Sequence, residues 1–277
     1  MKNQFIIAIS SMLLLASCSI LNKTENIEEV NLGEVTVKPE NPLEYQPSET
    51  RINDLIHTKL DVKFDWKKAH LYGRANLTLK PYFLPTDSLW LDAKGFEIKE
   101  IVLIEKTGVE TPLSYSYTDK MRVRINLGKT YTRNDTYEIA MTYIAKPNEL
   151  EEGGSAAITS DKGLYFINPN GLEENKPKQI WTQGETEASS CWFPTIDAPN
   201  ERMTQEIYMT VDTHYVTLSN GLLLFQTENG DGTRTDYWKQ KLPHAPYLAM
   251  MAVGEFAIVK DSWRNIGVNY YVEPKFE

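Results

Sequence analysis

The sequence predicts an all-β protein of curved sheets or a β-sandwich, with mainly antiparallel strands. Apolar and polar side chains alternate with a period of two in successive segments, as they do in half-buried strands. Turns rich in Gly, Asn, Asp and Pro separate these segments at short intervals. No segment of the folded part shows the sustained periodicity of a long amphipathic helix. Sheets joined by short turns are therefore the expected architecture.

The chain begins with a predicted secretory signal peptide, residues 1–17. Lys2 gives it a positive start, and an apolar run follows from Phe5 to Leu15. This run is shorter than the roughly 20 residues that a helix needs to cross a bilayer, and no later segment comes close to that length. The mature protein is therefore expected to leave the cytoplasm.

A candidate lipidation site ends the signal peptide. The residues Leu15-Ala16-Ser17-Cys18 resemble the lipobox of bacterial lipoproteins, in which cleavage before the cysteine accompanies its acylation. The alternative is an ordinary signal peptide with a chance cysteine near its end. Lipidation of Cys18 predicts an exported protein anchored to a bacterial membrane, with the outer membrane expected, facing the periplasm or the cell exterior.

A flexible tether is predicted over residues 18–50, followed by a folded domain over residues 51–277. Asn, Glu, Lys, Pro and Ser dominate the tether, and its apolar residues show no periodicity. The remaining stretch of about 225 residues is long enough to bury a sizeable core.

Strands are expected at intervals through this domain. The first places Ile56, Thr58, Leu60, Val62 and Phe64 on its inward face and ends in a short hairpin connection at residues 66–69. A strong turn at residues 229–232 precedes a strand over residues 234–242, and residues 149–155 are expected to form an exposed loop. The inward residues expected in the other strands are Gly73, Ala75, Leu77 and Leu79; Met121, Val123, Ile125 and Leu127; Tyr137, Ile139, Met141 and Tyr143; and Gln205, Ile207, Met209 and Val211.

Charge and cysteine content exclude some classes of protein. The net charge is -9 and basic clusters are missing, which argues against nucleic-acid binding. The chain has two cysteines, Cys18 and Cys191. Acylation of Cys18 would leave no intramolecular disulfide, so a core must stabilise the fold.

The usual patterns of hydrolytic sites do not occur. The histidines at positions 57, 70, 214 and 244 are not spaced as H-E-x-x-H ligands, so no metal site is expected in this chain. Cys191 has no histidine near it in sequence and is expected to be buried rather than nucleophilic. The G-x-S-x-G and G-x-x-x-x-G-K-S/T motifs are also missing.

One segment, residues 181–200, lacks the alternation found on either side of it. It carries two carboxylates, Glu185 and Glu187, followed by the bulky pair Trp192 and Phe193. Composition alone predicts a structured loop between sheets with solvated carboxylates.

This segment resembles the signature of the aminopeptidase N family, the gluzincin zinc aminopeptidases that include leukotriene hydrolase. The family motifs T-Q-x-E and W-F-P-x-x-D-x-P stand here at residues 182–185 and 192–199. A third motif, P-x-x-x-Y-L-x-A-F-x-x-G-x-F, resembles residues 243–256, with Met250 and Met251 in place of A-F. The resemblance covers residues 51–277 and implies a saddle-shaped, mostly β amino-terminal domain, whose last strand would span residues 266–271.

The family's G-x-M-E-N and H-E-x-x-H motifs are missing from the sequence. The resemblance therefore implies that zinc, the general base and the tyrosine that stabilises the tetrahedral intermediate belong to a catalytic domain expected beyond Glu277. This chain is then expected to bind no metal and to be inactive alone.

The resemblance also implies roles for individual residues in binding peptide substrates. Carried over by position, Glu185 would bind the free ammonium of the substrate and Gln183 would line the pocket for its first side chain. Such a charge-assisted hydrogen bond is about twice as strong as a neutral one. Trp192, Phe193 and Asp197 would fix the loop. The alternative is a lipid-anchored β domain that binds a peptide or glycan without catalysis.

Overall fold

The structure is a computed structural model that describes residues 48–150 and 161–277. The predicted signal peptide, Cys18, most of the predicted tether and part of the predicted loop at 149–155 lie outside the described residues. The stretch Thr50–Glu277 forms one compact unit. Within the described part of the chain, no helix is both long enough and apolar enough to span a membrane.

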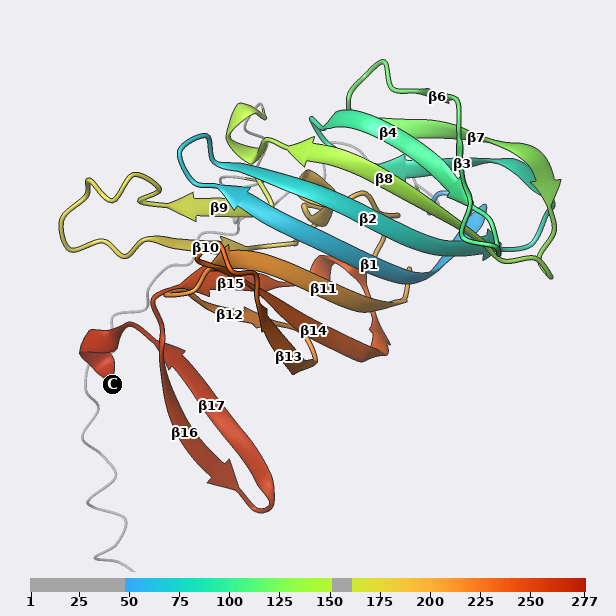
Figure 1. Cartoon of the computed structure of the whole chain (residues 1–277). Coiled ribbons are helices and arrows are strands. Elements are labelled where there is room, and N and C mark those ends of the chain that lie inside the picture. Colours follow the sequence, from blue (N-terminus) through green and yellow to red (C-terminus); the bar gives the residue numbers. More distant parts are fainter. Residues whose placement is uncertain (1–47, 151–160) are drawn as a thin grey trace, which may run out of the picture. The chain divides into compact units, whose positions relative to one another are not determined.

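An eight-stranded sheet is the largest element of this unit (Figure 1). Its strand order is β13-β14-β11-β1-β2-β8-β4-β5. Neighbouring strands are antiparallel except β1 and β11, which are parallel. The strands are β1 Asn53–Asp65, β2 His70–Pro81, β4 Glu97–Ile104, β5 Glu110–Pro112, β8 Tyr137–Ala145, β11 Met203–Asp212, β13 Leu222–Glu228 and β14 Thr233–His244.

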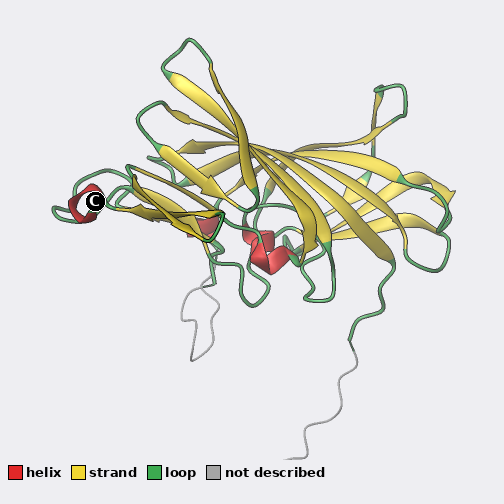
Figure 2. Cartoon of the chain, turned by 90° about the horizontal axis from the view of Figure 1, so that it is seen from below, coloured by secondary structure: helices red, strands yellow, loops and turns green. Residues whose placement is uncertain are grey.

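Three smaller sheets complete the unit, with orders β12-β15-β10-β9, β3-β7-β6 and β16-β17. Helical residues occur only in short 3-10 turns of the described chain, as Figure 2 shows. The strands are β3 Thr86–Asp92, β6 Tyr115–Ser116, β7 Arg122–Tyr131, β9 Leu164–Ile167, β10 Gln179–Thr182, β12 Val216–Ser219, β15 Met251–Gly254, β16 Ala257–Trp263 and β17 Ile266–Val272. The turns are η1 Pro147–Glu149, η2 Ser189–Cys191, η3 Pro246–Leu248 and η4 Pro274–Phe276.

The predicted all-β class and mainly antiparallel pairing are confirmed. The expected alternation holds along β2, where every second residue from Leu71 to Pro81 is buried, and along β11 from Met203 to Val211. The strand expected at residues 266–271 is β17.

Two of the inward positions expected from the sequence are wrong. The pairing of β1 with β2 shifts register between Leu55 and His57, so Leu55 is buried and Ile56 is only half-buried. A bulge adds one residue and therefore reverses which neighbour faces inward. Met121 is 46% exposed because it precedes β7, which begins at Arg122.

One hydrophobic cluster joins the large sheet to the four-stranded and three-stranded sheets. It includes Leu77 of β2, Ile125 of β7 and Ile180 of β10, all fully buried. Close packing in its interior depends on Gly73, where a Cβ would lie 2.5 Å from the ring of Tyr143. Because Ile180 of β10 belongs to this cluster, the loop at residues 181–200 starts from a strand that is anchored in the core.

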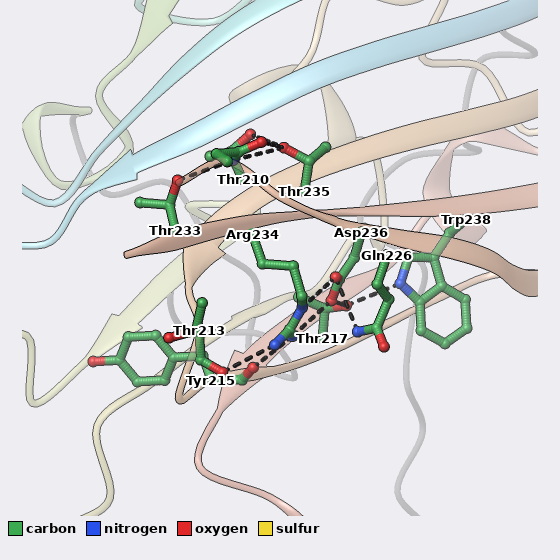
Figure 3. A network of polar contacts seen from close by, with 11 residues as sticks. Thr210, Thr213, Tyr215, Thr217, Gln226, Thr233, Arg234, Thr235, Asp236 and Trp238 are labelled. Carbon is green, nitrogen blue, oxygen red and sulfur yellow. Dashed lines mark hydrogen bonds and ion pairs between the residues drawn. The ribbon is translucent and has the colours of Figure 1, made fainter. Parts of the chain in front are cut away.

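A buried ion pair ties the large sheet to the four-stranded sheet (Figure 3). Arg234 Nε on β14 lies 2.6 Å from Oδ1 of the fully buried Asp236. Thr217 Oγ1 on β12 donates to Asp236 Oδ2 at 2.7 Å and accepts from Trp238 Nε1 at 3.0 Å. Gln226 Nε2 on β13 donates to Asp236 Oδ1 at 3.0 Å. Donors from three strands thus offset the cost of burying this charge.

Candidate functional site

The T-Q-x-E residues stand at the end of β10, an inner strand of the four-stranded sheet. β10 pairs with β15, which lies in the stretch 243–256, so two segments far apart in the sequence adjoin. Thr182 Oγ1 accepts a hydrogen bond from the Met251 amide at 3.1 Å. The Gln183 amide donates to the Gly163 carbonyl at 3.0 Å, just before β9. Both neighbouring strands therefore fix the start of the loop.

Gly184 packs against the segment before β15. It is buried, and a Cβ there would lie 2.2 Å from the carbonyl oxygen of Tyr247 and 2.7 Å from Oγ of Ser189. The Ala188 amide donates to the Gly184 carbonyl at 2.9 Å and closes the turn. This chain accommodates only a glycine at position 184, because the backbone there packs directly against the backbone of Tyr247.

Glu185 lies on the exposed side of this turn. Its amide donates to Oε1 of Gln183 at 3.1 Å, so the half-buried Gln183 side chain lies over the turn. The peptide bond between Glu185 and Thr186 is cis. Among the described residues, no cation or hydrogen-bond donor contacts the Glu185 carboxylate. The predicted pair is thus brought together, with one carboxylate open to a cation from outside.

Glu187 is also exposed, as expected from composition, but the loop uses only its backbone. Lys94 Nζ donates to the Glu187 carbonyl oxygen at 2.6 Å. Ser190 Oγ donates to the same oxygen at 3.3 Å. Because its side chain is not part of these contacts, Glu187 is a natural control for Glu185.

The bulky pair that follows holds the loop, as predicted. Trp192 and Phe193 are fully buried, with ring centroids 4.4 Å apart. Tyr143 Oη on β8 donates to the Trp192 carbonyl at 3.0 Å. The far end of the loop is therefore anchored in the central core.

Asp197 is buried and braces the loop internally. Its Oδ2 accepts the Ser190 amide at 2.8 Å, and its own amide donates to Oδ2 of Asp92 at 2.9 Å. The backbone of Asp92 pairs with that of Thr195 in an isolated bridge. Burial raises the pKa of Asp197 to about 6, against the bond from Ser190 that lowers it. Through these bonds Asp197 links the two ends of the loop segment from Ser190 to Asp197.

The remaining polar candidates have structural roles. Cys191 is fully buried with Sγ 3.4 Å from the Asp161 carbonyl oxygen, and burial raises the pKa of its thiol to about 12, so it is a poor nucleophile. His57 and His244 contact Thr204 and Gln205, and burial lowers the pKa of both histidines.

The described residues do not fit a zinc site. They contain no group of three or more His, Cys, Asp or Glu side chains able to hold a metal ion. A zinc site of the usual kind needs at least three such ligands from the protein. Any zinc chemistry of the family therefore has no ligands in the described part of this chain.

A stacked aromatic pair beside the motif, with one exposed member, was not singled out in the sequence. Trp181 on β10 is 39% exposed and stacks on Tyr165 of β9, with ring centroids 4.5 Å apart and planes 17° apart. Trp181 lies two residues before Gln183, which directly follows the end of β10 at Thr182. The sequence signal that could have identified Trp181 is its position directly before T-Q-x-E.

Neither of two hollows in the described surface includes the motif. One, of about 210 Å³, is lined by residues of the three-stranded sheet, including Ser88, Tyr115 and Arg124. The other lies at the β1–β2 turn around Trp66. Gln183 and Glu185 line neither of these two hollows.

Comparison with known proteins agrees with the fold and the loop. The model of the Peptidase M1 N-terminal domain matches residues 41–248. The chain is 26% identical over 176 residues to the puromycin-sensitive aminopeptidase of Caenorhabditis elegans, which covers 63% of this chain and 18% of that protein. It is 29% identical over 104 residues to transcription initiation factor TFIID subunit 2 of Gallus gallus, covering 36% and 9% respectively.

Solved structures have the same fold. An M1 zinc metallopeptidase from Deinococcus radiodurans aligns with a TM-score of 0.65 at 20% identity, covering 76% of this chain and 44% of that one. A mutant two-domain M1 zinc metallopeptidase bound to L-arginine gives the same score and identity, covering 79% and 47%. The chain thus spans less than half of the solved chains and less than a fifth of the curated relatives. Since the family model matches most of its length, the chain belongs to the Peptidase M1 N-terminal domain family.

Proposed function

We propose that this chain is the amino-terminal, substrate-anchoring domain of a zinc metallo-aminopeptidase that removes amino-terminal residues from peptides. The observation that carries the proposal is the open carboxylate of Glu185 on a loop whose following residues, Ala188 to Thr195, are buried. The family assignment and the names of the aminopeptidase and metallopeptidase relatives support the reaction class.

In this proposal Glu185 binds the substrate ammonium. A carboxylate without a partner among the described residues can accept N–H bonds from a cation without first breaking an ion pair there. Gln183 already accepts the Glu185 amide through its side-chain oxygen. In this proposal its side-chain amide nitrogen lines the pocket that the second domain completes for the first substrate residue. The rigid core behind the loop keeps both groups in place, as orientation requires.

The zinc, the general base and the tyrosine of the reaction would come from a catalytic domain carboxy-terminal to Glu277. The described residues contain no group of three or more His, Cys, Asp or Glu side chains that could hold a metal ion. This chain would then have no peptidase activity alone, and its site would be completed by the second domain.

A second candidate function is a non-catalytic domain that binds a peptide or glycan. One relative carries the name of a transcription initiation factor subunit rather than of a peptidase, so membership of the family does not imply catalysis. The stacked pair of Trp181 and Tyr165 beside the motif would suit such binding.

We also propose that the protein is exported and anchored at Cys18 to a bacterial membrane. The proposal rests on the signal pattern and on the lipobox-like residues before Cys18. Intact mass of the exported protein tests it, because acylation adds the mass of the fatty acyl chains to a chain that begins at Cys18.

Glu185→Gln in the complete gene product tests the anchoring role, with Glu187→Gln as the matched control. Loss of a charge pair of this kind costs about 2 to 5 kcal/mol, so kcat/KM for amino-acid anilides should fall about 100-fold. The preference for a free over an acetylated amino terminus should fall with it. Equal kinetics of the two variants would contradict the role of Glu185.

A further inference from the structure

A patch of exposed apolar residues, the amino-terminal patch, lies where the chain enters the folded unit. It consists of Ile52, Tyr82, Phe83 and Leu84, which are 46%, 50%, 67% and 69% exposed. With the exposed Pro85, the loop after β2 forms a run of four consecutive apolar residues in contact with water. Such a run on a soluble surface calls for a function.

The patch is part of the fold. The first residue of β1, Asn53, pairs with the last residue of β2, Pro81. The Tyr82 amide donates to the Ile52 carbonyl at 2.8 Å, and the Arg51 guanidinium lies 4.5 Å from the centroid of the Tyr82 ring. The loop is therefore held beside Thr50, where the compact unit begins.

Another apolar side chain is exposed at the same end of the large sheet. The pairings from β1 through β11 to β14 bring the start of β1 and the end of β14 to one end. Leu242 near the end of β14 is 73% exposed. One more exposed apolar side chain thus lies on β14 at this end of the sheet.

A continuation of the chain past Glu277 would start from another side of the unit. Figure 1 shows the start of β1 and the end of β2 on the side away from the β16–β17 hairpin and the carboxy terminus. The patch instead lies beside Thr50, the residue at which the compact unit begins. About 30 residues separate Cys18 from Thr50, and a flexible chain of that length has a root-mean-square span of about 30 Å.

We propose that the amino-terminal patch rests on the lipid surface and orients the domain on the membrane. The apolar side chains of its loop enter the boundary between headgroups and acyl chains, and Tyr82 lies at headgroup depth. Arg51 is paired with Asp54 and Glu201, and Lys80 Nζ lies 3.3 Å from Asp54, so the patch carries little net charge. Contact with lipid is therefore driven by apolar burial and depends little on salt or on anionic lipid.

The test uses the gene product from Ser19 to its natural carboxy terminus, with a histidine tag placed before Ser19. The tag binds nickel-chelating lipid in phosphatidylcholine vesicles, so the amino-terminal tether is supplied whether or not Cys18 is acylated. A fluorescent dye is attached at Phe83→Cys or, as the matched control, at Lys68→Cys. Lys68 is 63% exposed at the opposite end of β1 and β2. Cys191, the one native cysteine of residues 19–277, is buried, and any exposed cysteine past Glu277 is replaced by serine in both proteins.

Quenchers placed on the lipids report contact. The dye at position 83 should be quenched about twofold or more relative to the dye at position 68, since a side chain in the boundary region lies within reach of lipid-borne groups. The difference should persist in high salt. Equal quenching at the two positions would overturn the proposal.

A second outcome would also overturn the proposal. In it, the dye at position 83 is already shielded from aqueous iodide before vesicles are added. That result would assign the patch to another part of the chain or to a second copy. The proposal uses anchorage at Cys18 only to argue which side of the domain faces the membrane. Because the intact mass of the exported protein reports acylation separately, a failure of the patch and a failure of the anchor are distinguishable.

Discussion

At the residue scale, the position of Glu185 depends on its neighbour Gly184. The backbone of Gly184 meets the Tyr247 carbonyl so closely that no side chain fits between them. The sequence motif marks this glycine only as a variable position, and its contact partner lies more than sixty residues away along the chain. The carboxylate could therefore be located from the sequence, whereas the contact that positions it could not.

Gly184→Ala should displace the loop. The added Cβ would meet backbone rather than a movable side chain, so we expect a loss of about 1 to 3 kcal/mol in the free energy of unfolding. Urea unfolding measures the loss. Gly267→Ala is the control, because a Cβ at Gly267 would meet nothing within 4 Å. Equal free energies of unfolding for the two variants would contradict this prediction and show that the loop can move to accommodate the added Cβ.

Asp197 should make stability depend on pH. Burial raises the pKa of its carboxyl in the folded state to about 6 from an ordinary 3.8. The folded state then holds the proton more tightly than the unfolded state, so this contribution to stability is present below about pH 4 and is lost as the pH rises to about 6.

Asp197→Asn removes this titration. Relative to the variant, the wild-type free energy of unfolding should fall by about 1 to 3 kcal/mol between about pH 4 and pH 7. Denaturant unfolding at both pH values measures the difference. If the free energies of unfolding of the two proteins change in parallel with pH, the assignment of a raised pKa to Asp197 is wrong.

At the scale of elements, alternation identified the long strands and failed for short and edge strands. β13 could not be recognised, because all seven of its residues are exposed and none alternates. β9, β10, β12 and β15 have only four residues each, too few for a periodic pattern. The bulge at Leu55 is likewise invisible in sequence, since it follows from the pairing with β2.

The ion pair between Arg234 and Asp236 should stabilise the junction of the two sheets. Asp236→Ala leaves Arg234 and Thr217 without their shared acceptor in a buried site, so the free energy of unfolding should fall by about 3 kcal/mol. Asp61→Ala, at an exposed position of β1, should change it by less than about 0.5 kcal/mol. Thermal unfolding compares them, and a small effect at Asp236 would mean that water satisfies the freed groups.

At the scale of the whole molecule, the fold class and the family followed from the sequence because both depend on local patterns. Period-two alternation gave the strands, and the motif around Glu185 and Trp192 gave the resemblance that the family match confirms. Sheet order did not follow, because the parallel pairing of β1 with β11 joins segments with no local signal for each other. The exposed patch at Phe83 also needed the structure, since exposure is a tertiary property.

The central claim is that this domain anchors substrates for a zinc active site supplied by another part of the protein. The most direct measurement is aminopeptidase activity, with zinc content, on residues 19–277 beside the complete gene product. We expect zinc and activity in the complete product and neither in residues 19–277, because the described residues hold no metal ligands. A complete product without zinc and without activity would contradict the claim and favour a binding domain.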